Sequence, residues 1–356
     1  MFEIANGFLP RSINAELLRG VLVSGLITAF AIAKLHPVAE RLRLLDEPAG
    51  RKQHLFAIPP IGGLCIALGI GVAGLLAPFG MAEFRYLGLA ALGILLVGIL
   101  DDLKEVSVFQ KIVAQFLIAA FLVVVGNLTV VSVGDIFAWK DGNEQGLSWL
   151  SQPFTVIAIV AAVNAFNLID GHDGLAGSLF FVSLLSILAI TAGLHEDKLV
   201  YLCGILSSAT CAFLYFNLRN YPKTKYKVFL GDGGSTMIGL ILAYLLIRLS
   251  LPDPHRIISP AIAPWIIGLP VLDMAAVLAK RLIQRVSVSL PDRQHIHHQL
   301  LDYGLPKHTT LIVLLALHTA LCLVGVISHK LAVPDWALFW GYFSAGLIYI
   351  GFRISR

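Results

Sequence analysis

Residues 164–178 carry the densest set of reactive side chains in this chain, with two amides, two carboxylates and a histidine between two strongly apolar runs. Asn164, Asn167 and Asp170 are spaced three residues apart, so they share one face of a helix or of its last turn. Asp173 follows between two glycines that would end the helix. Polar groups at membrane depth are costly and usually functional. We therefore predict a site for a metal or a polar ligand here.

Paired carboxylates and a glycine-rich segment carry related chemistry elsewhere. Asp101 and Asp102 end an apolar run, where adjacent carboxylates repel each other unless a cation lies nearby. Residues 231–235 (Gly-Asp-Gly-Gly-Ser) open another apolar run, and glycine-rich backbone at a helix N-terminus binds anions. A carboxylate at Asp232 in such a position suggests a bound cation, for which Mg²⁺ suits oxygen ligands. The alternative is that Asp232 caps the helix together with Ser235.

Two loops add cations and histidines. Residues 45–54 combine acids with an Arg-Lys pair and are followed by a Gly-Gly pair at 62–63. They could bind a nucleotide or phosphate, or simply form a basic loop at the membrane surface. Residues 291–298 (Pro-Asp-Arg-Gln-His-Ile-His-His) favour phosphate or sugar contacts over zinc, because no Cys or Glu-x-x-His motif accompanies them. Asp273, inside an apolar run, is expected to pair with an amide or an arginine.

The composition places these clusters in a membrane protein. Of the 356 residues, 57% are hydrophobic and only 13% are charged, whereas about 25% are charged in soluble domains. The apolar residues fall in blocks of roughly 17–22, long enough to cross a bilayer as helices. We predict an all-α, polytopic membrane bundle, a single domain over residues 1–356, with about eleven spans. They are expected near 17–35, 59–80, 84–100, 112–131, 153–168, 174–193, 198–218, 228–248, 258–280, 309–329 and 334–353.

Lysine and arginine placement predicts the orientation of the bundle. Most of the 26 Lys and Arg residues fall in the loops that share a side with the C-terminus, and such loops face the cytoplasm. All the polar clusters described above follow odd-numbered spans or open the next span from that side. We therefore expect them to form one site on the cytoplasmic face. The net charge of +4 reflects this topology, and no basic stretch with interleaved aromatics indicates nucleic-acid binding.

The motifs together resemble those of a known enzyme family. Asp101-Asp102, Asn164-x-x-Asn167-x-x-Asp170-Gly-x-Asp173, Gly231-Asp232-x-Gly-Ser235 and His295-Ile-His-His298 are similar to those of the polyprenyl-phosphate N-acetylhexosamine-1-phosphate transferases. The resemblance covers nearly the whole chain. Residues 292–298 are most similar to the bacterial members that join N-acetylglucosamine-1-phosphate to undecaprenyl phosphate. His172 departs from the apolar residue that bacterial relatives often carry.

This resemblance implies an enzyme of the bacterial inner membrane with its active site facing the cytoplasm. It would transfer N-acetylglucosamine-1-phosphate from UDP-N-acetylglucosamine to undecaprenyl phosphate, release UMP, and begin synthesis of O-antigen lipopolysaccharide or a related surface glycan. Another UDP-N-acetylhexosamine, or UDP-N-acetylmuramoyl-pentapeptide, stays open as donor. A transporter of anionic metabolites is the competing class, although transporters place charges near the midplane and commonly contain internal repeats. A homodimer is compatible with the sequence.

The resemblance also implies residue roles. Asn167 and Asp232 would hold Mg²⁺, for which Mn²⁺ could substitute, and Asp101 or Asp102 would act on the lipid phosphate, by direct attack or through an aspartyl-phosphate. The remaining residues would bind substrate. Asp46 and Lys52 would contact the nucleotide, and Lys111 would contact a phosphate. The donor pyrophosphate and sugar would be contacted by Arg293, His295, His297 and His298, and the substrate site would also include Asn164, Asp170 and Asp173.

Overall fold

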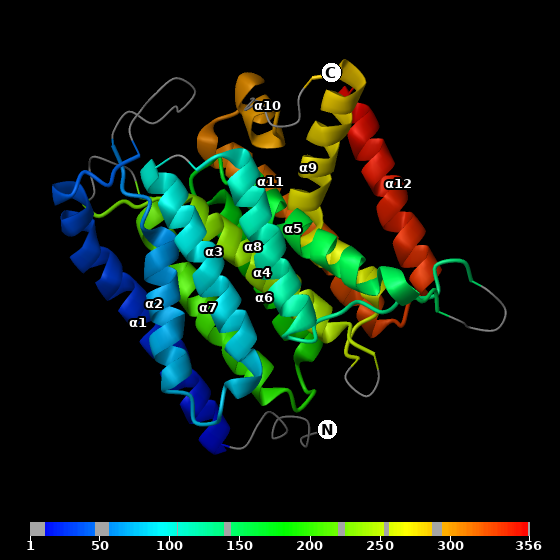
Figure 1. The fold of residues 1–356 in the computed structure, drawn as a ribbon, viewed down its shortest axis with the longest axis horizontal. Helices are drawn as coiled ribbons and strands as arrows, with labels where there is room; N and C mark the ends of the chain where they lie inside the picture. The colour runs from blue at the N-terminus through cyan, green and yellow to red at the C-terminus, as the bar shows by residue number, and fades with distance from the viewer. Residues whose placement is uncertain are drawn as a thin grey trace, which may run out of the picture.

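The computed structural model describes residues 11–46, 57–104, 106–138, 144–219, 225–252, 256–286 and 294–354, and within these ranges the fold is helical with two isolated bridges. Eleven of the described α-helices have 14 residues or more and form the bundle, and one short helix, α10, lies at its end (Figure 1). The α-helices are α1 (Arg11–Arg41), α2 (Gly62–Leu75), α3 (Arg85–Lys104), α4 (Val108–Val124), α5 (Ser151–Ile169), α6 (Leu175–Thr191), α7 (Asp197–Asn217), α8 (Gly231–Leu249), α9 (Ala263–Gln284), α10 (Ile296–Asp302), α11 (Lys307–Lys330) and α12 (Asp335–Ile354). Three 3₁₀ turns accompany them: η1 (Ala82–Phe84), η2 (Ser148–Leu150) and η3 (Pro260–Ile262).

Each predicted apolar segment contains a helix, which confirms the all-helical fold class. Eight of the described helices are long and apolar enough to cross a membrane, while α2, α4 and α6 are shorter. Helix length therefore does not confirm the predicted count of eleven spans. Apolar residues continue past the ends of the three short helices, but Pro78, Asn127 and Gly193 end them: proline restricts the residue before it, and the other two adopt positive φ.

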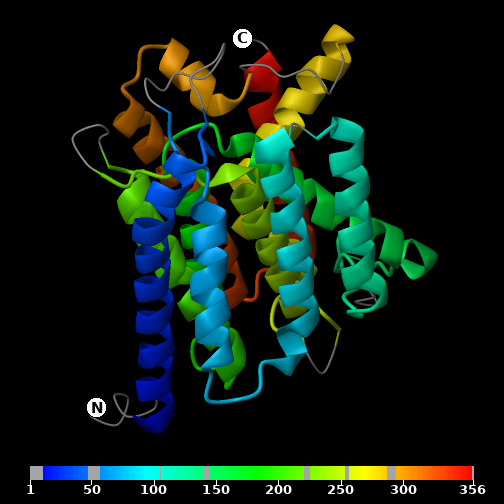
Figure 2. The same cartoon turned by 60° about the vertical axis from the view of Figure 1, so that its left-hand side comes forward.

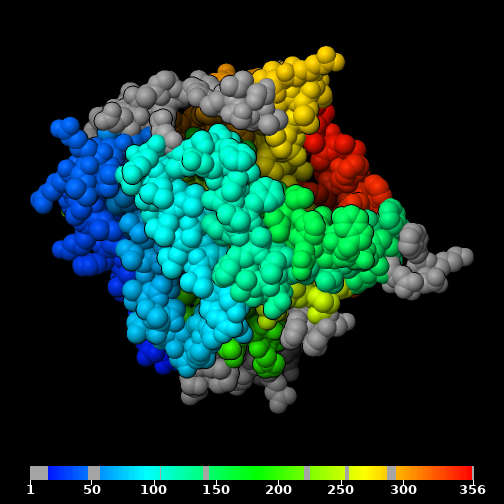
Figure 3. Space-filling model, in the orientation of Figure 1, coloured from blue at the N-terminus to red at the C-terminus, as the bar shows by residue number. Residues whose placement is uncertain are grey.

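Helix α8 forms the centre of the bundle, whereas α12 lies at its edge. Of the membrane-crossing window of α8, 89% is buried, against 17% for α12. Helix α8 packs against α2, α3, α5, α6 and α9, whereas the main contacts of α12 are with α9 and η3. The space-filling view shows α3 and α4 across the middle of one face, with α1 and α12 at its two sides (Figure 3). The residues in the first turn of α8 are therefore held in place by the helices packed around it.

Glycines bring the first turn of α8 against two other helices. A Cβ added at Gly63 of α2 would lie 2.2 Å from the Cα of Gly234, and one added at Gly98 of α3 would lie 2.2 Å from the Cα of Gly233. Small residues allow backbones to approach this closely in membrane bundles. The close packing places Asp232 beside the last turn of α3.

The C-terminal ends of α1, α3, α5, α7 and α9 lie at the same end of the bundle as the C-terminal end of α12 (Figures 1 and 2). The first turn of α1 lies at the opposite end. The helix ends next to the predicted polar clusters therefore share one end of the bundle.

Candidate active site

The turn between α3 and α4 holds an ion pair. Asp101, 8% exposed on the last turn of α3, accepts hydrogen bonds from the Val106 backbone N–H at 2.9 Å and from the Lys111 Nζ at 2.6 Å. Helix α4 begins with a capping box, in which the Ser107 hydroxyl accepts from the Gln110 N–H. The box fixes the first turn of α4 and so directs Lys111 toward α3.

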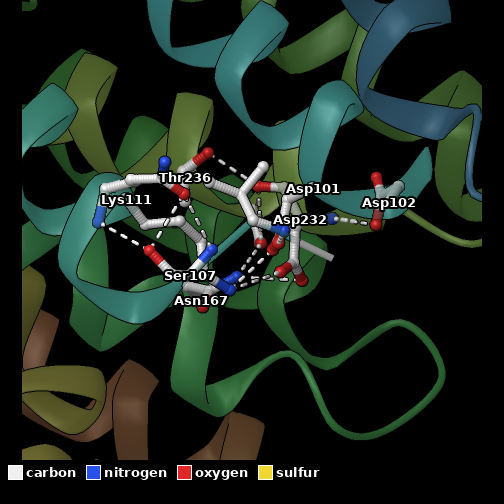
Figure 4. A network of polar contacts seen from close by, with 10 residues as sticks. Asp101, Asp102, Ser107, Lys111, Asn167, Asp232 and Thr236 are labelled. Atoms are coloured by element: carbon white, nitrogen blue, oxygen red, sulfur yellow. Dashed lines mark hydrogen bonds and ion pairs between the residues drawn. The ribbon is translucent and has the colours of Figure 1, made fainter. Parts of the chain in front are cut away.

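Residues from α5 and α8 complete this cluster. The Asn167 Nδ2 donates to the Asp232 Oδ1 at 3.2 Å and to the Ser235 Oγ at 3.0 Å. The Lys111 Nζ lies 3.9 Å from the Asp232 Oδ2, so one ammonium contacts carboxylates from both α3 and α8. Figure 4 shows these side chains gathered between the end of α3, the start of α4, the end of α5 and the start of α8. We refer to Asp101, Lys111, Asn167 and Asp232 as the carboxylate centre.

Asp102 has a different position from its neighbour. Its Oδ1 accepts the Asp232 backbone N–H at 3.3 Å, at the positive end of the α8 dipole. No side chain of α8 caps that helix, and its N-cap residue is Leu230. The alternative in which Asp232 is the cap is therefore wrong, because a carboxylate from α3 occupies that place. Asp101 and Asp102 thus face different partners.

The Gly-Gly pair of the first loop is not an anion cradle. The Gly62 and Gly63 N–H groups donate to the carbonyl oxygens of Phe229 and Leu230 at 2.8 and 2.9 Å. The predicted phosphate binding by this turn is wrong for these two amides, because the backbone before α8 already satisfies them. Asp46 is described, with its N–H donating to the Ile58 carbonyl, and its predicted nucleotide contact stays a prediction.

Negative charge exceeds positive charge at the carboxylate centre. Asp102 lies beside Asp101 and Asp232, and within the described ranges Lys111 is the cation that contacts the carboxylates of Asp101 and Asp232. Beside them, burial raises the pKa of Asp170 well above its ordinary value, and the charges of Asp232, Asp102 and Asp173 raise it further. A cluster of this kind attracts a cation.

The donor set of the centre suits magnesium. Mg²⁺ is usually held by one or two carboxylates, with waters and substrate phosphates completing six oxygens. Asp232 and the amide oxygen of Asn167 are donors of that kind. In the described part of the chain, no group of three or more His, Cys, Asp or Glu residues could hold a metal ion. The predicted roles of Asn167 and Asp232 remain predictions that the chemistry of these donors supports.

The rest of the predicted amide and carboxylate motif faces other partners. The Asn164 Nδ2 donates to the Gln115 Oε1 at 2.6 Å, across to α4. Asp173 pairs with the Lys227 Nζ at 2.7 Å. Neither Gln115 nor Lys227 was predicted, although a lone amide one turn after Lys111, on the same face of an apolar helix, is a signal that could have found Gln115.

Two histidines of the motif at the start of α10, His295 and His297, are buried. His295 donates from Nδ1 to the Asp273 Oδ2 at 2.7 Å, and its ring stacks on that of His297 with centroids 5.9 Å apart. His297 is 1% exposed, and neither of its ring nitrogens has a hydrogen-bond partner. Burial lowers the pKa of His297 to about 3, and the nearby rings of His298, His295 and His172 add to this effect. His297 also lies against Gly171, where a Cβ would come 2.3 Å from its Nε2.

Asp273 has the arginine partner that its sequence context predicted. The Arg353 Nη1 donates to Asp273 at 2.7 Å, and the Tyr349 hydroxyl donates to the same oxygen at 3.2 Å. The identity of this arginine could not be read from spacing, because it lies 80 residues further along the chain. The predicted substrate contacts of Lys52 and Arg293 lie outside the described residues.

Comparison with known proteins shows which family has a similar sequence. The family model of glycosyl transferase family 4 matches residues 84–250, the segment that contains the whole carboxylate centre. The chain is 33% identical over 352 residues to the undecaprenyl-phosphate alpha-N-acetylglucosaminyl 1-phosphate transferase of Escherichia coli O157:H7, covering 97% of this chain and 92% of the relative. It is 34% identical to the enzyme of the same name from Yersinia pestis, covering 90% and 86%. It is 31% identical to the probable undecaprenyl-phosphate N-acetylglucosaminyl 1-phosphate transferase of Bacillus subtilis strain 168, covering 83% and 81%.

Proposed function

The chain belongs to glycosyl transferase family 4, and from this premise we propose that it transfers N-acetylglucosamine-1-phosphate from UDP-N-acetylglucosamine to undecaprenyl phosphate. The products would be undecaprenyl-diphospho-N-acetylglucosamine and UMP. The names of the relatives support the lipid acceptor and the N-acetylglucosaminyl phosphate group. Most of the structural support comes from the meeting of Asp101, Lys111, Asn167 and Asp232 at one end of a multi-pass bundle.

The proposed reaction joins two anions. An oxygen of the lipid phosphate forms a bond to the phosphorus that carries the sugar, and the bond from that phosphorus to the UMP oxygen breaks. A phosphate monoester has a second pKa near 6, so the attacking oxygen is mostly ionised at neutral pH. A strong general base is therefore unnecessary. The larger need is positive charge that offsets the phosphates in the transition state.

Lys111 and a divalent cation would supply that charge. Asn167 and Asp232 would hold Mg²⁺, or Mn²⁺ in its place, and the bound ion would neutralise phosphate oxygens of the donor. Lys111 already bridges Asp101 and Asp232, so it lies where a phosphate would approach. A phosphate would draw the lysine from the carboxylates without moving a helix.

The two aspartates would position the reactants. Asp101 orients Lys111, and Asp102 accepts a backbone amide at the start of α8. Both carboxylates are engaged by donors, which weakens them as nucleophiles. Direct attack by the lipid phosphate is therefore the better route, and the aspartyl-phosphate route is the alternative.

The donor would approach from the cytoplasm. The Lys and Arg distribution in the sequence favours that orientation. In a bacterial inner membrane the lipid product would start O-antigen or a related surface glycan.

Purified protein in detergent provides the test. Incubation with UDP-N-acetylglucosamine and undecaprenyl phosphate should release UMP and give a lipid whose mass has increased by N-acetylglucosamine-1-phosphate. Parallel reactions with UDP-N-acetylgalactosamine and UDP-N-acetylmuramoyl-pentapeptide test the donor. Release of UMP only with another donor would change the sugar, whereas no UMP with any donor would overturn the proposed function and leave transport as the competing class.

A further inference from the structure

We propose that Arg353 and Tyr349 of α12 are positioning residues for the donor, acting through Asp273 on His295. This inference rests on the proposed function and adds a part of the chain, its last helix, to the site. Neither residue belongs to the carboxylate centre. Both lie near the end of a helix that is otherwise peripheral to the bundle (Figure 1).

Four donors from two parts of the chain, the start of α10 and the end of α12, converge on Asp273. This carboxylate, 1% exposed on α9, accepts from the His295 Nδ1 at 2.7 Å, the Ile296 N–H at 3.0 Å, the Arg353 Nη1 at 2.7 Å and the Tyr349 hydroxyl at 3.2 Å. Arg353 is itself 3% exposed, and its Nη1 also donates to the Tyr349 hydroxyl at 2.6 Å. We refer to these residues as the Asp273 network.

The contacts of this network fix the start of α10, in addition to joining α12 to α9. A second nitrogen of Arg353, Nη2, donates to the carbonyl oxygen of Gln294, and Asp273 binds the side chain of His295 and the amide of Ile296. Burying two charges carries a desolvation cost that apolar side chains holding α12 to α9 would avoid. The charged groups hold three consecutive residues of the histidine motif, which apolar contacts could not orient in this way.

The consequence for His295 is a fixed ring. Its Nδ1 is committed to Asp273, so Nε2 is the nitrogen left for a ligand, beside the parallel ring of His297. A carboxylate that holds one ring nitrogen fixes both the tautomer and the orientation of the imidazole. A ring held in this way donates its Nδ1 hydrogen to Asp273 and directs its Nε2 toward a phosphate oxygen of the donor.

Steady-state kinetics with each substrate varied in turn test this inference. Arg353→Gln should lower kcat/KM for UDP-N-acetylglucosamine by about 100-fold, because a misplaced group costs that much. The apparent KM for undecaprenyl phosphate should stay close to that of the wild type. Arg353→Lys should recover part of the loss, since lysine can meet Asp273 but lacks the planar fork that also reaches Gln294.

A double variant separates positioning from packing. If Arg353 acts through His295, then Arg353→Gln should add little to the loss already caused by His295→Gln. Tyr349→Phe and Tyr342→Phe form a matched pair on α12, because each removes one hydroxyl that donates to α9. Tyr342→Phe is the control, since the Tyr342 hydroxyl donates to the Gly268 carbonyl oxygen at 3.3 Å. Tyr349→Phe should impair use of the donor, whereas Tyr342→Phe should leave donor kinetics unchanged.

The possible outcomes are distinct. Additive losses in the double variant, equal losses for the two substrates, or equal effects of the two tyrosine changes would overturn the inference. An active wild type with unchanged Arg353→Gln and Tyr349→Phe kinetics would overturn this inference alone. A wild type that releases no UMP would overturn the proposed function and this inference with it. A donor-selective, non-additive loss supports the positioning role.

Discussion

The carboxylate centre and the Asp273 network lie toward the same end of the bundle but differ in how the negative charge of their aspartates is balanced. At the carboxylate centre, Lys111 is the described cation that contacts Asp101 and Asp232, and Asp102 lies on a helix end. In the Asp273 network a single carboxylate accepts four hydrogen bonds, including those from Arg353 and His295. A carboxylate whose bonding capacity is filled serves the scaffold, while a surplus of negative charge indicates a place for a cation or a substrate.

The same comparison separates the helices that carry the two groups. The carboxylate centre is built on the first turn of α8, the most buried helix, so its geometry is held by packing on every side. The Asp273 network joins α9 to the peripheral helix α12, where polar contacts add to the packing between the two helices. Substitutions should therefore reduce activity without lowering stability in the first group, and should lower stability together with use of the donor in the second.

The largest expected effect is on turnover at the carboxylate centre. Asp232→Asn keeps the size of the side chain but removes a hard anionic ligand, and we expect UMP release to fall by about 1,000-fold, near the upper end for loss of one electrostatic contact. The melting temperature in detergent should not fall, because the change removes charge from a crowded cluster. Activity within tenfold of wild type would remove Asp232 from the reaction.

The counterpart in the Asp273 network should unfold more easily. Asp273→Asn leaves a buried arginine without its carboxylate, and breaking a buried pair costs about 3–5 kcal/mol. Thermal denaturation in detergent measures this, with Asp232→Asn as the matched Asp-to-Asn control. If Asp273→Asn melts like the control, the distinction between a scaffold carboxylate and a site carboxylate fails.

The adjacent aspartates should differ from each other. Asp101→Asn breaks the contact that orients Lys111 and should slow turnover by about 100-fold. Asp102→Asn retains an oxygen that can accept the Asp232 N–H and loses only its charge at the helix end, so a loss of about tenfold or less is expected. The rates of UMP release by the two variants, measured at the same protein concentration, give the ratio of the two losses in turnover. Equal losses would mean that the two carboxylates share one role.

The smallest expected effect is a pH dependence of stability at His297. Because the pKa of His297 in the folded protein is about 3, below the ordinary 6.5, the unfolded chain binds a proton between these values and the folded protein does not. Stability is therefore fully present above pH 6.5 and falls as the pH drops, by at most about 1.4 kcal/mol per unit. His297→Gln should flatten the acid side of the melting profile. His308→Gln, at an exposed histidine, serves as the control and should leave the profile unchanged.

Much of the site could be predicted because its residues are polar where their neighbours are apolar. Asn167 and Asp232 interrupt apolar runs at the starts or ends of helices, and the order of the spans places them at one end of the bundle. Tyr349 and Arg353 could not be found in this way. A tyrosine and an arginine near the end of a terminal helix look like ordinary residues of the membrane surface, and their partners lie 76 and 80 residues away.

The helix ends were also beyond the reach of hydropathy. An apolar window continues through Pro78, Asn127 and Gly193, but the backbone at these positions leaves the helix. The roles of the glycines were likewise ambiguous in the sequence. Gly62 and Gly63 resemble an anion-binding turn, whereas in the fold they bring α2 against the start of α8. Only tertiary contacts distinguish a glycine that meets a ligand from one that meets a helix.

The central claim is that the surplus of carboxylates at the α3, α5 and α8 ends forms the reaction centre together with a divalent cation. The most direct measurement is UMP release by the purified wild type after removal of divalent ions by a chelator, followed by titration with Mg²⁺. We predict no UMP without added Mg²⁺, and recovery that requires both Mg²⁺ and undecaprenyl phosphate. Full UMP release in the presence of excess chelator would contradict the claim.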